Sequence, residues 1–206
     1  MKKFFFIVII LFVSVFVLWK FVFKKERKPS GPEPVGMTVS KHSVDFNQSI
    51  SKLMDAYYGL TEAFVNWDTA VVNDKAHGLK TAIDSLRLQE MQKDSAIYPT
   101  VQSQWGMVKT ELEGLMADAT LGDKRESLNM LSQQIFDLLR IVKYDLAKVY
   151  YQECPMALNN YETSGYWLSS EAADEKRRNP YLGLHDPKYS KAMLTCGNTR
   201  DSVRIN

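Results

Sequence analysis

The sequence predicts an all-α protein: an antiparallel four-helix bundle with a loop-rich C-terminal cap, preceded by a single transmembrane helix. Three observations support this. An apolar run of 20 residues lies near the start, four later stretches repeat apolar residues at spacings of three and four, and the last 55 residues lose that period. We assign residues 1–28 to the anchor with its basic flanks, 29–44 to a tether, and 45–206 to the bundle with its cap, which begins near residue 152.

The apolar run at residues 4–23 reads FFFIVIILFVSVFVLWKFVF and contains one Lys. A helix of about 20 such residues spans the core of a bilayer. A cleaved signal peptide is the alternative, but its apolar region is shorter, roughly 7–15 residues, and it ends in a small-x-small site. This run has no such site. We therefore expect an uncleaved anchor that contacts the membrane through residues 4–23.

Charge beside the anchor does not decide which side of the membrane the domain occupies. The C-terminal flank is the more basic one, and the positive-inside rule would leave it in the cytoplasm. Long C-terminal domains, however, cross largely regardless of loop charge. The expected location is a single-pass protein of the inner membrane with its soluble domain in the periplasm, and it rests on the family resemblance given below.

Net charge differs between the two parts of the chain. Residues 1–28 hold seven Lys/Arg against one Asp/Glu, a net +6, whereas the remainder holds 19 against 23, a net −4. A mildly acidic soluble part argues against a nucleic-acid partner. Its length suits one compact domain. Two Cys are too few for a disulfide-dense scaffold or a four-thiolate zinc site.

A Pro/Gly-rich segment, PSGPEPVGMTVSK, follows the anchor and predicts an extended tether. Each of the next four stretches places one apolar stripe on a helix, because its apolar residues recur with the helical period. The stripes run over residues 46–64, 72–86, 101–115 and 128–149. We expect most aromatic and Met residues on these stripes to pack in the core.

Helix-boundary residues agree with the four stripes. Asp68 is a suitable N-cap for the second helix, and Pro99 suits the first turn of the third. Gly122 separates the third stripe from the fourth, where Asp123 and Glu126 form a candidate capping box. The connections are short, so neighbouring helices are expected to run antiparallel in an up-down-up-down bundle.

Two sulfur-bearing motifs mark the C-terminal cap. One is Cys154-Pro-Met156-Ala, and the other is Met193-Leu-Thr-Cys196-Gly. Thiolate and thioether are soft donors that suit Cu(I). If the two motifs meet in space, Cys154, Met156, Met193 and Cys196 are candidate metal ligands, and His185 lies between them as a source of a nitrogen donor.

A disulfide between Cys154 and Cys196 is the alternative for the same motifs. It would close a loop of about 43 residues, for which the loop-entropy estimate is roughly 4 kcal/mol. Such a bond would hold together a loop-rich segment in an oxidising compartment. Met156 and Met193 would then fill the core. Spacing alone leaves both alternatives open.

The cap also resembles a known family. The runs YYQECPMALNNYETSGYWLSS, RRNPYLG and AMLTCG resemble the C-terminal signature of a bacterial domain of unknown function. That family occurs in small envelope proteins of Gram-negative bacteria and fused to periplasmic adaptors of copper/silver efflux systems. The resemblance extends from about Asp45 to Val203, and it implies a helical envelope domain that handles heavy metal. The matching positions are Cys154, Met156, Trp167, Asn179, Pro180, Tyr181, Met193 and Cys196.

The chain departs from the family pattern at residues 184–190, an extra stretch that contains His185, so the resemblance assigns no role to this histidine. The other two histidines, His42 and His77, lie far away in the sequence, and no nucleophile–base arrangement is evident. We therefore expect no enzymatic activity. The leading hypothesis is a membrane-anchored accessory protein that binds Cu(I) and passes it to a heavy-metal efflux or chaperone partner. The alternative is a structural or interaction module without metal.

Overall fold

The computed structural model of the chain describes residues 40–203. The predicted anchor at residues 4–23 and most of the tether lie outside the described residues. Within the described range, no helix combines the length and the apolar character needed to cross a membrane. In chain order the elements are α2 (Val44–Val65), α3 (Thr69–Asp84), the 3-10 helix η1 (Leu88–Lys93), α4 (Tyr98–Ala117), α5 (Leu121–Ile141), β1 (Val149–Leu158), β2 (Thr163–Ser169), the 3-10 helices η2 (Asp174–Lys176) and η3 (Ser190–Met193), and β3 (Asn198–Val203).

The four predicted helical stretches all form helices, and most of their boundary signals hold. The Asp68 side chain accepts a hydrogen bond from the Val71 amide (3.0 Å) at the start of α3, and Pro99 lies in the first turn of α4. The expected start of α5 was wrong. Its N-cap is Thr120, whose hydroxyl accepts from the Asp123 amide (3.1 Å), so Gly122 lies inside the helix.

The fourth helix is shorter than its apolar stripe predicted. Lys143 takes a positive φ of 56° directly after the C-cap. The amide of Tyr144 donates to the Leu139 carbonyl (3.0 Å) and that of Lys143 to Arg140 (3.1 Å), which is a Schellman ending. Because this position is normally Gly, the sequence carried no signal for the stop.

The prediction of an all-α fold was wrong, because the C-terminal region forms a three-stranded antiparallel sheet in the order β2-β1-β3. Tyr151 pairs with Leu168 of β2 and Asp201 of β3 in this register, and Cys154 pairs with Gly165. Irregular pairing follows Cys154, where Pro155 interrupts the ladder. The cap predicted as loop-rich thus contains a sheet, whose strands are accompanied by loops and the 3-10 helices η2 and η3.

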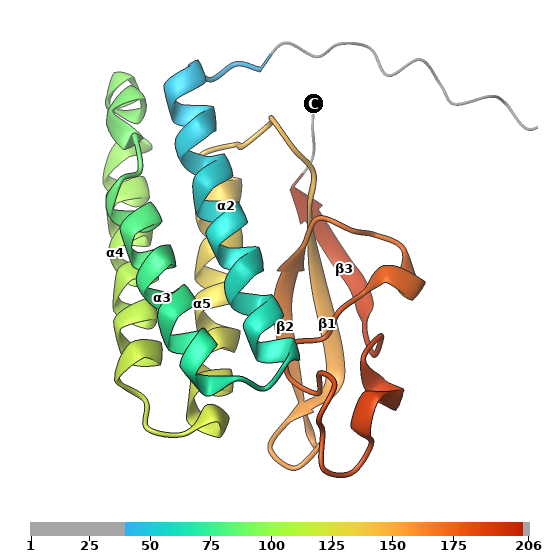
Figure 1. The fold of residues 1–206 in the computed structure, drawn as a ribbon. Coiled ribbons are helices and arrows are strands. Elements are labelled where there is room, and N and C mark those ends of the chain that lie inside the picture. The colour runs from blue at the N-terminus through green and yellow to red at the C-terminus, as the bar shows by residue number, and fades with distance from the viewer. Residues whose placement is uncertain (1–39, 204–206) are drawn as a thin grey trace, which may run out of the picture. The chain divides into compact units, whose positions relative to one another are not determined.

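The helices and the sheet stack in layers, with α2 and α5 lying between the α3–α4 pair and the sheet (Figure 1). Among the helices, α5 makes most of the contact with β2. One continuous core runs through all of these layers and includes the buried side chains of Phe46, Tyr57, Phe64, Leu79, Val108, Leu131, Phe136, Cys154, Trp167 and Tyr181. The sheet is therefore part of the same domain as the helices, and it fixes the C-terminal motifs against α5.

Candidate functional site

The two cysteines of the C-terminal motifs meet and form a disulfide. Cys154 lies in β1, Cys196 lies two residues before β3, and their Cα atoms are 5.6 Å apart. Cys154 is fully buried, whereas Cys196 is partly exposed. The disulfide joins the central strand to the segment that leads into β3. Of the two arrangements left open by spacing, the structure contains the disulfide.

Arg177 holds the segment around Cys196 against β1. Its Nε donates to Oε1 of Gln152 (3.0 Å), and its Nη1 donates to the carbonyls of Gly197 (2.7 Å) and Thr195 (3.3 Å). The side chain is 2% exposed, and its Nη2 pairs with Asp174 (2.6 Å). These contacts bracket Cys196 on both sides. The loop is therefore fixed by the hydrogen bonds of a buried arginine as well as by the covalent bond.

Asn179, from the Asn-Pro-Tyr motif, also fixes the Cys196 segment. Its backbone amide donates to the Leu194 carbonyl (2.8 Å), and its side-chain amide donates to the Cys196 carbonyl (3.1 Å). Its side-chain oxygen accepts from the amides of Tyr181 (2.8 Å) and Leu182 (3.1 Å). Asn179 is fully buried. This residue of the family-like signature thus has a structural role around the disulfide.

The other two predicted ligands, Met156 and Met193, are partly buried and pack against the core. Met193 ends η3, and its carbonyl accepts from the Cys196 amide (3.0 Å). His185 is exposed in the loop between the motifs. Among residues 40–203, no group of three or more His, Cys, Asp or Glu side chains is arranged to hold a metal ion. A soft-metal site would require the reduced cysteines, so metal binding stays a prediction.

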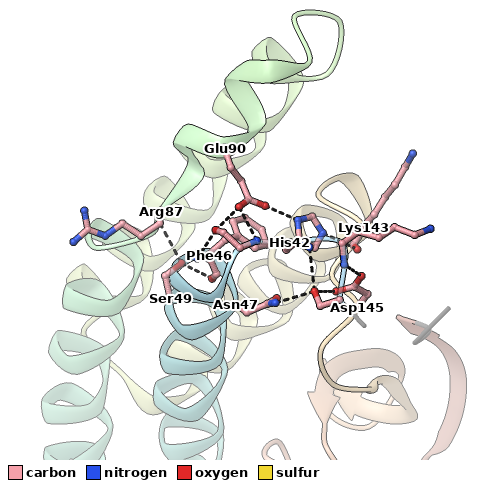
Figure 2. Close-up of polar contacts among 11 residues, drawn as sticks. His42, Phe46, Asn47, Ser49, Arg87, Glu90, Lys143 and Asp145 are labelled. Carbon is pink, nitrogen blue, oxygen red and sulfur yellow. Dashed lines mark hydrogen bonds and ion pairs between the residues drawn. The ribbon is translucent and has the colours of Figure 1, made fainter. Parts of the chain in front are cut away.

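A second polar cluster, which we call the N-terminal clasp, surrounds the residues just before α2 (Figure 2). It comprises Ser40, Lys41, His42 and Ser43 together with Glu90, Lys143 and Asp145. The Glu90 carboxylate contacts His42 Nδ1 (2.6 Å) and accepts from the Ser43 amide (3.0 Å) and hydroxyl. Ser43 is also the N-cap of α2. The clasp therefore joins the start of α2 to η1.

The opposite side of the clasp is Asp145, in the connection between α5 and β1. It accepts from the Ser40 hydroxyl (2.5 Å) and from the Lys41 amide (2.9 Å). The His42 ring stacks on Phe46, with centroids 4.5 Å apart, and its Nε2 faces the Lys143 carbonyl (3.1 Å). A neutral imidazole carries one N–H, so only the doubly protonated ring donates to both facing acceptors.

Both clasp carboxyls have a lowered pKa. Burial opposes ionisation of Glu90, but hydrogen bonds from Ser43 and His42 outweigh it and lower the pKa of this carboxyl. Burial likewise opposes ionisation of Asp145, whereas hydrogen bonds from Lys41 and Ser40 lower its pKa. Because Ser43 bonds to a carboxylate and not to the imidazole, the clasp has no serine–histidine pair for nucleophilic chemistry. The geometry of the clasp suits a structural role, in which it fixes residues 40–43 to the rest of the domain.

Sequence reasoning missed this cluster. The sequence places His42 in the predicted tether, far from the other histidines. The clasp partners of residues 40–43 lie 47 to 105 positions further along the chain. The one local signal was Ser43, a typical N-cap residue three positions before Phe46. The long-range partners carry no pattern in the sequence.

A family model of known sequences matches part of the chain. The family model described as "Protein of unknown function (DUF3347)" matches residues 53–145, from the middle of α2 to the connection after α5. No curated protein and no solved structure matches the chain. The matched residues exclude the C-terminal motifs on which the resemblance was based, so the signature and the fusion to efflux adaptors stay predictions. A DUF3347 domain, a domain of unknown function, is thus found at residues 53–145.

Proposed function

We propose that the chain is a non-enzymatic interaction module, anchored to the inner membrane by residues 4–23 and carrying its folded domain in the periplasm. The observation that supports this proposal is the Cys154–Cys196 disulfide. Disulfides persist in oxidising compartments and are rare in the reducing cytosol. Cys154 is fully buried in β1, and Arg177 and Asn179 hold the segment around Cys196, which favours a structural bond over a transient one.

The N-terminal clasp supports the anchoring part of the proposal. Residues 40–43 are bound on one side by Glu90 and on the other by Asp145. A segment that leads from an anchor into α2 would be fixed to the domain there. The rigid sheet with its disulfide would then present a constant surface to a partner.

Two measurements on the full-length chain in native membranes test this proposal. Alkylation without reductant, followed by peptide mapping, should recover the Cys154 and Cys196 peptides linked to each other. A reporter fused after Asn206 should be active only on the periplasmic side. Recovery of two alkylated cysteines, or a reporter that is active only in the cytoplasm, would reject the proposal.

A second candidate function is binding of a soft metal such as Cu(I) by the reduced protein, which would pass it to a heavy-metal efflux or chaperone partner. The convergence of the two cysteines favours it, because each brings a methionine within three residues along the chain. Four sulfur donors from two segments match the preference of Cu(I). This candidate requires reduction of the disulfide before binding.

A Cu(I) titration of the reduced full-length chain against a competing chelator tests this second candidate. Cys154→Ser/Cys196→Ser should abolish tight binding. Met156→Leu/Met193→Leu keeps the volume of the core and should weaken binding about tenfold if the thioethers ligate. Met130→Leu, at an exposed methionine on α5, is the matched control and should change nothing. Binding that is unaffected by the cysteine variant would exclude this function.

A further inference from the structure

A cavity of about 360 Å³ lies between the start of α5, the β1–β2 turn and the loop after Tyr181. Its wall contains aromatic side chains, among them Trp67 and Tyr161, and charged side chains, among them Arg125 and Asp186. Its volume falls in the range of small-molecule sites, roughly 300–1,000 Å³. Neither the disulfide cysteines nor the clasp residues line it. The cavity is therefore a separate feature of the domain.

Arg125 is the unusual residue of this cavity. It is 9% exposed, and its guanidinium carbon lies 3.8 Å from the centre of the Trp67 ring. Its Nε and Nη2 atoms are buried and have no hydrogen-bond partner among the described residues. Buried charged donors are normally paired, because an unpaired one loses its hydration without replacement. Arg125 thus lines the cavity with a guanidinium group of which two donors are unsatisfied.

The nearest acid does not satisfy these donors. Asp186 is 6% exposed, and its carboxylate already accepts from the amides of Lys188 (3.0 Å) and Tyr189 (2.7 Å) and from the Tyr161 hydroxyl (3.1 Å). No ion pair within the described residues joins it to Arg125. Burial lowers the pKa of Arg125 to about 10, and the nearby Asp186 and Tyr161 offset part of this effect. The guanidinium is therefore charged at neutral pH.

The aromatic surface under Arg125 is held in place. Trp67 Nε1 donates to the Leu182 carbonyl (3.0 Å). Gly183 lies against the same ring, because a Cβ atom added there would be 2.8 Å from Trp67 Nε1. The ring, and with it the stacked guanidinium, is positioned before any ligand arrives. Such preorganisation lowers the entropy lost on binding.

The donors and the surrounding charges indicate the ligand class. The planar fork of Arg matches the two oxygens of a carboxylate. The carboxylates of Asp123, Glu126 and Asp186 also line the cavity and repel any anion, so a doubly charged phosphate fits less well than a singly charged carboxylate. We propose that this cavity binds a small organic carboxylate, whose charged end pairs with Arg125 and whose apolar body packs on Trp67 and Tyr161.

This inference goes beyond the proposed function, since it requires neither a metal nor a redox change at the disulfide. Calorimetric titration of the full-length chain in one non-ionic detergent tests it with three probes: phenylacetate, its neutral analogue phenylacetamide, and inorganic phosphate. Phenylacetate should bind one per chain, and the other two should bind about tenfold more weakly or not at all, because charge-assisted bidentate pairs are the strong ones. Absence of phenylacetate binding, equal binding of the amide, or preference for phosphate would overturn the proposal.

Two variants test whether Arg125 is the residue that binds the carboxylate. Arg125→Gln should weaken phenylacetate binding at least about tenfold. Arg140→Gln is the matched control, since Arg140 is on the same helix and also lies over an aromatic ring, Phe136, but its side chain is 58% exposed. It should bind as the wild type does. Equal affinity in Arg125→Gln and the wild type would overturn the assignment.

A further measurement keeps the test decisive if Arg125→Gln does not fold, as judged by its circular dichroism. The Nε–H signal of Arg125 in the wild type should then shift on addition of phenylacetate and stay in place with phenylacetamide. An unchanged signal at saturating phenylacetate would overturn the proposal. Disulfide mapping of the same sample tests the proposed function independently. A negative result for the carboxylate site therefore does not affect the test of the disulfide, and the reverse also holds.

Discussion

The Tyr57 hydroxyl lies 2.7 Å from Oγ of Ser132, and this buried contact joins α2 to α5. Because the Ser132 hydroxyl already donates to the Leu128 carbonyl (2.6 Å), Tyr57 is the donor of the pair. The Leu168 amide in turn donates to the Tyr57 oxygen (3.0 Å). One side chain thus connects two helices with β2. The neighbouring outward amide of β2, at Tyr166, donates to Asn129 of α5 (2.8 Å), so helix side chains pair two amides of this edge strand.

Tyr57→Phe should lower the free energy of unfolding by about 1–3 kcal/mol, because it leaves the buried Leu168 amide without an acceptor. Urea denaturation measures the change. Tyr98→Phe is the matched control, since the Tyr98 hydroxyl forms hydrogen bonds, among the described residues, only with the exposed side chains of Gln92 and Gln102. Its effect should stay within about 0.5 kcal/mol. Equal losses in the two variants would show that the buried junction adds no stability of its own.

Stability should decline as the pH rises above about 10, the ordinary pKa of tyrosine. Burial raises the pKa of Tyr57 and Tyr181 in the folded state, and burial raises that of Tyr151 as well. Between the unfolded and the folded pKa, the unfolded chain loses protons that the folded chain keeps, so the free energy of unfolding falls. Urea denaturation from pH 8 to pH 11 should show this decline, with a smaller slope in Tyr57→Phe. A slope unaffected by this variant would contradict the assignment to Tyr57.

The helical half of the fold was predictable because its information is local. The stripes and Asp68 placed α2 to α5 close to their observed positions, since the helical period reflects burial on one face. The helical period gave a wrong prediction at Val149, which continues the fourth apolar stripe but is the first residue of β1. The helix ends at Ile141, and Lys143 just beyond its C-cap takes a backbone conformation that usually belongs to Gly. An apolar residue indicates that its position is buried, but it does not indicate whether that position lies in a helix or in a strand.

The sheet was missed because its strands do not alternate. In β1 the residues Gln152, Glu153 and Cys154 are buried in succession, since the strand is covered on both faces. Pro155 inside the strand also argued against a strand assignment. The convergence of Cys154 and Cys196 was anticipated from sulfur chemistry. The clasp and the Arg125 cavity were not, because they depend on pairs of residues far apart in the chain.

Removal of the disulfide should destabilise the domain. Cys154 and Cys196 are 42 residues apart, and the loop-entropy estimate for such a loop is about 4 kcal/mol. Cys154→Ser/Cys196→Ser should therefore lose up to about 4 kcal/mol of unfolding free energy in urea. Reductant should weaken the wild type and leave the variant unchanged. A wild type that is indifferent to reductant would show that the bond does not stabilise the fold.

The clasp should contribute stability at neutral pH and lose it in acid. The lowered pKa values of Glu90 and Asp145 imply stabilisation that is present above the ordinary carboxyl pKa of about 4 and lost as the pH falls below it. Glu90→Gln should cost about 1–2 kcal/mol at pH 7 and much less at pH 3, measured by urea denaturation. Glu113→Gln, at a glutamate whose side chain is 66% exposed, is the control and should show little effect at either pH. A cost of Glu90→Gln that is the same at both values would contradict the role of its charge.

The same Gly-to-Ala change should have opposite effects at two positions. Gly183 has a φ of +57°, and a Cβ atom there would meet the Val65 carbonyl and the Trp67 ring. Gly183→Ala should therefore cost about 1–3 kcal/mol through strain and overpacking. Gly78, inside α3, has no atom within 4 Å of an added Cβ, so Gly78→Ala should stabilise the domain by about 0.5–1 kcal/mol.

Gly183→Ala should also weaken phenylacetate binding, because a displaced Trp67 ring no longer supports the Arg125 guanidinium. Urea denaturation and calorimetry on the two glycine variants measure both effects. The Gly78→Ala protein should keep wild-type affinity. If Gly183→Ala destabilises the domain and leaves the affinity intact, the position of Trp67 is important for folding alone, and the ring is not part of the carboxylate site.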